Sequence, residues 1–166
     1  MIRITFFPDS DIKNYLQATA EYQKIWNEEG ERIVNAIESI SSLKFKEKFI
    51  NAMILERPSQ SHPMTLRASL SIKSKKATIV HELCHRLLSG NGIRMKIQDQ
   101  ATELNIHKNI NLILFDIWND LFGENFAKEN VERESRLGNY YREAWIYVLS
   151  LSKEERAKKF KELINK

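Results

Sequence analysis

The hydrophobic pattern of the first 55 residues predicts a strand, a long helix and a second strand. Apolar and polar side chains alternate loosely from Ile2 to Phe7, and Pro8 follows, which is typical of a short strand. Between residues 12 and 40 the apolar side chains recur at three- and four-residue spacing, which indicates one face of a long helix. Residues 45–55 are rich in apolar side chains and indicate a second strand.

Residues 65–72 show the most regular alternation in the chain. Leu66, Ala68, Leu70 and Ile72 fall on one face and polar side chains fall on the other, which predicts a third strand. A strand that lies just before a helix can offer unpaired backbone groups to an extended peptide. We therefore expect a peptide or protein substrate to bind along residues 65–72.

Helical patterns dominate the rest of the chain. Helices are predicted at residues 77–88, 99–122, 125–136, 140–149 and 153–164. Ser74 is expected to cap the first of these helices, Gly90-Asn91-Gly92 to end it, and Ser152 with Glu155 to form a capping box before the last. These elements predict an α+β fold, with a small, mostly antiparallel sheet of about three strands packed against helices.

The composition is typical of a soluble globular protein and predicts a single domain over residues 1–166. Of the 166 residues, 42% are hydrophobic and 29% are charged. No apolar run is long enough to span a membrane, and the N-terminal residues do not have the pattern of a signal peptide. The single cysteine, Cys84, allows no internal disulfide. These features predict a cytoplasmic protein without a membrane partner.

The net charge of +4 is concentrated at the C-terminus. Residues 153–166 contain six Lys or Arg and three Glu, and the rest of the chain is close to neutral. A basic helix of this kind is usually a solvated surface, so a nucleic-acid partner is not expected. The alternative is a nucleic-acid-associated protein that contacts phosphate through Lys158, Lys159 and Lys161.

The pentapeptide His81-Glu82-Leu83-Cys84-His85 lies inside the helix predicted at residues 77–88. Residues four apart share a helix face, so His81 and His85 can both direct an imidazole at one metal ion. Glu82 lies beside that face, where it can take a proton from a water that the metal activates. This arrangement of residue types predicts a zinc site with hydrolytic chemistry. We interpret Cys84 as a small core residue.

A third ligand is expected from the helix predicted at residues 99–122, because catalytic zinc usually has three protein ligands. On a helical wheel, Glu103 and His107 fall one turn apart in the middle of the apolar face, whereas Asp116 and Asp120 fall on the polar side. Ionisable groups on a buried face are rarely unpaired. One of the two can bind zinc while the other orients a ligand, or the two can form a buried pair without any metal.

With these residues in place, the chain resembles the zincin metallopeptidases, especially the compact gluzincins called minigluzincins. The resemblance covers roughly residues 65–122 and implies a zincin-like helical core, bound Zn²⁺ and peptide-bond hydrolysis with Glu82 as the general base. In that group the third ligand is a helix glutamate, and an acidic residue one turn later supports a ligand histidine. Glu103 would then bind zinc, but His107 departs from the acidic pattern. We favour His107 as the third ligand, with Glu103 as its support.

The C-terminal helices would then be additions to this core, and they supply candidates for stabilising the oxyanion of the transition state. Zincins often use a Tyr, His or Arg for this purpose, which makes Tyr140, Tyr141 and Arg142 the candidates. The other class of function that the residues allow is a metal-bound regulatory or binding module without significant turnover.

Overall fold

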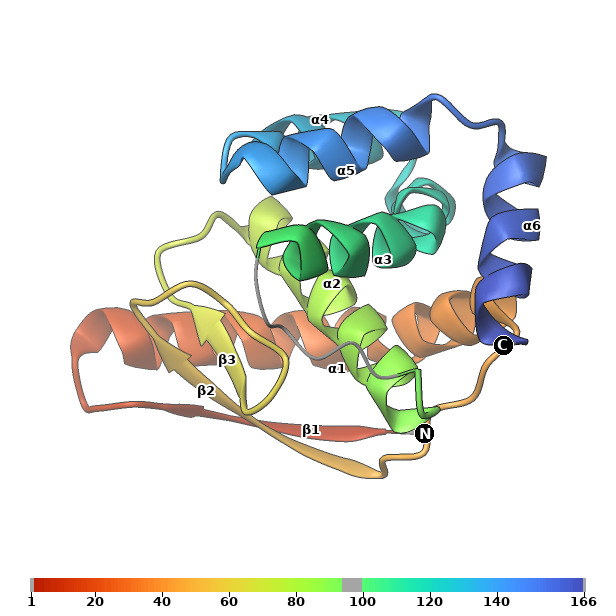
Figure 1. The fold of residues 1–166 in the computed structure, drawn as a ribbon. Helices are drawn as coiled ribbons and strands as arrows, with labels where there is room; N and C mark the ends of the chain where they lie inside the picture. Colours follow the sequence, from red (N-terminus) through yellow and green to blue (C-terminus); the bar gives the residue numbers. More distant parts are fainter. Residues whose placement is uncertain (1, 94–99, 166) are drawn as a thin grey trace.

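Residues 2–93 and 100–165 are described by a computed structural model, in which a small sheet and a set of helices share one hydrophobic core (Figure 1). The α+β class expected from the sequence is confirmed. The described elements are β1 (Arg3–Pro8), α1 (Lys13–Ser41), β2 (Phe49–Leu55), β3 (Met64–Arg67), α2 (Ile72–Gly90), α3 (Gln100–Phe122), α4 (Glu124–Ser135), α5 (Asn139–Leu149) and α6 (Lys153–Ile164).

The three strands lie in the order β1-β2-β3, and both strand pairs are parallel. The prediction of a mostly antiparallel sheet was therefore wrong. The 29-residue helix α1 carries the chain back along the sheet, so β2 starts beside the start of β1, with Arg3 opposite Phe49. Alternation of apolar residues identifies a strand, but only the connection between two strands decides their relative direction.

Strand β3 is shorter than the alternation of residues 65–72 predicts. It ends at Arg67, and α2 begins at Ile72 with Ser71, not Ser74, as the cap that accepts a hydrogen bond from the Ser74 amide. Between them, the backbone amide of Ser69 donates to the Glu56 carboxylate instead of to another strand. The alternating pattern continues in the sequence, but after the Ala68 amide, which donates to the Leu55 carbonyl at 2.9 Å, the Ser69 amide turns to a side chain.

The outer edge of β3 is covered by the chain's own preceding loop. The backbone N–H and C=O of Thr65 both pair with Gln60, at N···O distances of 2.9 and 3.0 Å, and the Arg67 amide donates to Ser59 Oγ. These backbone groups are therefore already paired at the place where a bound peptide strand was expected.

Helix α2 is buried on most of its sides. It contacts α1, α3 and β3, and Ile79, Val80, Leu83 and Leu87 are fully buried (Figure 1). Helix α3 is the other central element and contacts α1, α2, α4, α5 and α6. No helix within residues 2–93 and 100–165 is long and apolar enough to cross a membrane.

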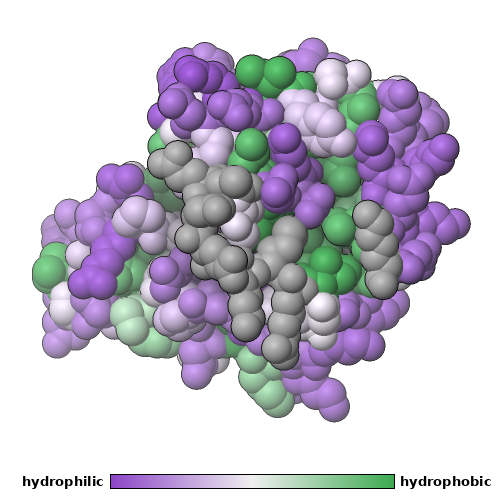
Figure 2. Space-filling model, in the orientation of Figure 1, coloured by the Kyte–Doolittle hydropathy of each residue, from purple (hydrophilic) through white to green (hydrophobic). Residues whose placement is uncertain are grey.

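Helix α6 packs against α3 through a buried ion pair. The Arg156 guanidinium donates two hydrogen bonds to Asp116, at 3.0 and 2.8 Å, and a third to the Leu151 carbonyl. The wheel placed Asp116 on the polar side of its helix, which was wrong because α6 covers that position. The exposed face of α6 is hydrophilic, at the right of Figure 2, and Ser152 and Glu155 form the predicted capping box at its start.

Asp116→Ala is expected to lower the free energy of unfolding by about 3–5 kcal/mol, because it leaves the Arg156 charge buried without its partner. Urea denaturation followed by circular dichroism measures the change. Asp120→Ala is the matched control, since Asp120 is exposed on the same helix. A loss that is no larger for Asp116→Ala than for Asp120→Ala would contradict the structural role of the pair.

Candidate metal centre

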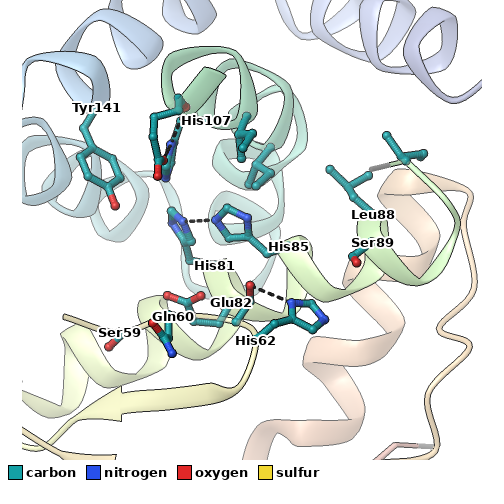
Figure 3. Close-up of a pocket in the computed structure, with 15 residues that line it drawn as sticks. Ser59, Gln60, His62, His81, Glu82, His85, Leu88, Ser89, His107 and Tyr141 are labelled. Atoms are coloured by element: carbon teal, nitrogen blue, oxygen red, sulfur yellow. Dashed lines mark hydrogen bonds and ion pairs between the residues drawn. The ribbon is translucent and has the colours of Figure 1, made fainter. Parts of the chain in front are cut away.

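His81 and His85 lie one turn apart on α2 and turn their rings toward the same point (Figure 3). Their Nε2 atoms are 3.0 Å apart, and the ring centroids are separated by 4.9 Å. His81 is 6% exposed, and its helix is held by apolar contacts on the other sides. The spacing of the motif therefore produces the shared direction that the sequence predicted.

The third imidazole of the cluster comes from α3. His107 is 3% exposed, and ligand atoms of His81, His85 and His107 all lie within 4.8 Å of one another. The Glu103 side chain, by contrast, remains 27% exposed and lies at the edge of the cluster, with Oε2 3.5 Å from His107 Nδ1. Of the two candidates for a third ligand, the structure brings His107 to the centre.

Hydrogen bonds at Nδ1 of two of these rings, His81 and His107, direct their Nε2 atoms toward the cluster. His107 Nδ1 donates to the Glu103 carbonyl at 2.9 Å, and His81 Nδ1 lies 2.8 Å from the Glu134 carboxylate. A ring that donates from Nδ1 presents the Nε2 lone pair, which is the form that binds a metal. This group of three imidazoles could therefore hold a metal ion, and zinc is among the ions that imidazole ligands suit.

The pKa values of the three imidazoles differ because their surroundings differ. Burial lowers the pKa of His107 to about 4, and burial with the neighbouring imidazoles lowers that of His85 well below its usual value. Burial also acts to lower the pKa of His81, but the charge and hydrogen bond of Glu134 outweigh it and raise the value. His85 and His107 are thus held in the neutral form that metal binding needs.

The sequence did not predict Glu134. This residue lies on α4, 53 positions after His81, and its carboxylate also accepts a hydrogen bond from Trp145 Nε1 at 3.1 Å. Burial acts to raise its pKa, but His81 and Arg133 outweigh that effect and lower it. Its position relative to Phe126 and Asn130, at four-residue spacing on the buried side of α4, was the available signal.

Glu82 lies next to His81, is 6% exposed and faces the same cavity. Burial raises its pKa to about 7, and the nearby Glu134 acts in the same direction whereas His81 opposes it. A carboxylate with a pKa close to neutral can both accept and release a proton. Cys84 is fully buried, and burial raises the pKa of its thiol, in agreement with its interpretation as a core residue.

Two cavities adjoin the imidazoles, one of about 460 Å³ and one of about 150 Å³. Both are lined by Ser59, His81, Glu82 and Tyr141, so they meet beside the metal-binding group. Figure 3 shows the larger cavity, with Ser59 and Gln60 on one side and Tyr141 on the other. The candidate metal centre is therefore accessible to a ligand larger than water.

Among the three transition-state candidates, Tyr141 has the most suitable position. Its ring centroid is 4.3 Å from that of His107, and it lines both cavities. The ring centroid of Tyr140 is 5.5 Å from that of His107 and 4.5 Å from that of Tyr141, and the two tyrosine rings are tilted relative to each other. Arg142 is exposed, donates to Asn139 Oδ1 and lines neither of these two cavities.

No protein-family model, curated protein or solved structure matches this chain. The function has to be inferred from the chain's own residues.

The loop that borders the cavity is anchored by the residue after His85. The Arg86 guanidinium donates to the Ser61 carbonyl and forms two hydrogen bonds to Glu47. His62 lies on this loop, is exposed and also lines the cavity. The pKa of His62 is lowered by partial burial and by the charge of Arg86. Helix α2 thus supplies two imidazoles and also fixes the loop opposite them.

Proposed function

We propose that the protein is a zinc-dependent metallopeptidase. The observation that carries this proposal is the convergence of His81, His85 and His107, with Glu82 on the adjoining helix position. Three protein ligands and an open fourth position are typical of catalytic zinc, whereas structural zinc is enclosed by four protein ligands. A peptide substrate is favoured because the cavity is wide and is lined by both polar and apolar groups.

When bound, zinc supplies Lewis-acid chemistry, lowering the pKa of the attacking water and polarising the scissile carbonyl. Glu82 Oε accepts the proton that the water loses and then passes it to the leaving amine nitrogen. Its burial next to His81 keeps bulk water away from this transfer. Glu82 therefore acts as the general base in the first step and as the general acid in the second.

Tyr141 is placed to stabilise the negative charge that develops on the carbonyl oxygen. Burial raises the pKa of its phenol above the usual value, so the hydroxyl remains a hydrogen-bond donor. A fixed donor at the developing oxyanion is worth several kcal/mol in acyl-transfer reactions. Tyr140 and Arg142 are less suitable because of their positions.

Glu134 acts as a positioning residue for His81. Glu134→Gln is expected to weaken zinc binding about 10–100-fold, because a neutral amide holds the His81 Nδ1–H less firmly than a carboxylate does. Competition with a chromophoric chelator measures the affinity. Glu132→Gln is the matched control, since the Glu132 side chain is 65% exposed on the same helix. Unchanged zinc affinity in a folded Glu134→Gln protein would exclude this role.

Metal removal tests the proposal as a whole. The purified protein is expected to contain zinc and to cleave members of a mixed peptide library. Dialysis against a chelator should abolish the cleavage, and added zinc should restore it. Cleavage that survives complete zinc removal would overturn the proposal. Stoichiometric zinc without cleavage of any peptide would instead support a regulatory module without turnover.

A further inference from the structure

The two cavities adjoin each other beside the metal centre, and we refer to them together as the groove, whose two ends differ in chemistry. Their linings share Ser59, His81, Glu82 and Tyr141, which Figure 3 labels among the residues of the larger cavity. We call the larger part the apolar end and the smaller part the arginine end. Because Glu82 lines both parts, a peptide with its scissile bond there can place a side chain in each.

The apolar end has one apolar wall, from α2, α3 and Ile93, and one polar wall, from the loop residues 59–62. Leu88, Ile106 and Ile110 are buried and line it, together with Ile93. Glu103 is the acidic side chain that lines this end and not the other, and it lies on the same α3 face as Ile106 and Ile110. This end can accept a large apolar side chain and repels a carboxylate.

The arginine end is lined by Arg67 and Arg133, by Leu70 and Leu137, and by the carboxylates of Glu82 and Glu134. Arg67 is already paired with Glu56, so Arg133 is the main donor for a ligand. The Arg133 side chain is 26% exposed, donates through Nε to Asn130 and has Nη2 3.6 Å from Glu134. A guanidinium has five N–H donors, so these contacts with the described residues leave donors for a ligand. The Glu134 carboxylate is engaged more closely by His81 and Trp145 than by Arg133.

We propose that the groove selects peptides with a large apolar side chain in the apolar end and a carboxylate in the arginine end. This specificity rests on the proposed peptidase function. Guanidinium and carboxylate groups form strong, geometrically defined hydrogen bonds, and Arg133 supplies them at a partly buried position. Repulsion by Glu103 disfavours the reversed placement, so the two ends together fix the register of the peptide past Glu82.

The test uses fluorescent octapeptides with Leu on one side of the central bond and Glu on the other, in both orders, and matched peptides with Gln in place of Glu. Each is made with a free and with an amidated C-terminus. Binding is measured by fluorescence anisotropy on zinc-loaded Glu82→Gln protein, and cleavage is measured with wild-type protein. In one of the two orders, the Glu peptide is expected to bind about tenfold more tightly than its Gln counterpart.

Replacement of the arginines assigns the preference to the groove. Arg133→Gln, combined with Glu82→Gln, is expected to reduce the Glu-to-Gln binding ratio to near one. Arg136→Gln is the matched control, since Arg136 lies on the edge of the same helix with its side chain 75% exposed, and it should keep the ratio. Arg67→Gln is measured as a second test of the arginine end, so that the result does not depend on the Arg133 variant alone if that variant folds poorly.

The two proposals fail in different ways. Equal binding of Glu and Gln peptides, with either C-terminus, would overturn the specificity even if wild-type protein cleaves them. A preference that persists in both arginine variants would do the same. A preference for the free C-terminus that Arg133→Gln removes assigns the carboxylate to the chain end and supports the proposal. Selective binding without cleavage by wild-type protein would overturn the peptidase function and leave the specificity standing.

Discussion

Glu82→Gln is expected to keep zinc and to lose peptidase activity by about 10²–10⁴-fold, the range that general acid–base catalysis contributes. The amide has nearly the shape of the carboxylate but cannot accept the proton of the attacking water. The Glu82 carboxyl, with its pKa raised to about 7, can also release this proton to the leaving amine, which the amide cannot do. Initial rates on a fluorogenic peptide and zinc content by elemental analysis measure the two effects separately.

The matched control for this change is Glu28→Gln, because Glu28 lies on α1 with its side chain 57% exposed. It should leave both rate and zinc content unchanged. A Glu82→Gln protein that is folded, contains zinc and cleaves as fast as wild type would show that another group moves the proton.

His107→Ala is expected to weaken zinc binding by at least about 100-fold, which corresponds to about 2.7 kcal/mol. The change removes one of the three imidazoles whose ligand atoms lie within 4.8 Å of one another. Glu103→Ala should have a much smaller effect, since the Glu103 side chain is 27% exposed at the edge of the cluster. Chelator competition gives both affinities.

Thermal unfolding gives an independent measure for the same pair of variants. A ligand that binds only the folded state raises the melting temperature, so added zinc should stabilise wild type and Glu103→Ala but not His107→Ala. Unfolding without zinc shows whether either change damages the fold itself. The reverse order of affinities would assign the third ligand to Glu103, as the resemblance to minigluzincins implies.

The sequence predicted those parts of the site that depend on the period of a single helix. The i, i+4 spacing placed His81 and His85 on one face, and the wheel of α3 placed His107 toward the core. The same wheel also placed Glu103 in the core. Glu103 is partly exposed because it lies in the first turn of α3, which starts at Gln100 beside the cavity. A helical wheel gives the direction of a side chain, but it does not show whether other segments cover that turn of the helix.

The features that the sequence did not predict depend on contacts between distant segments. Glu134 reaches His81 from α4 only because α4 and α5 pack over α3, and Asp116 is buried only because α6 covers it. The parallel direction of β1 and β2 depends on where α1 returns the chain. The four-residue spacing of Phe126, Asn130 and Glu134 indicates a buried face of α4, but no local pattern indicates which distant residue lies against it.

The pairing of Gln60 with Thr65 also affects how copies of the protein meet. Exposed strand edges can template the addition of strands from other molecules and start aggregation. At β3, a four-residue strand has this edge paired at Thr65 by the preceding loop. The loop that borders the groove therefore also closes the β3 edge of the sheet, so that a strand from another molecule would have to add at β1, the other edge.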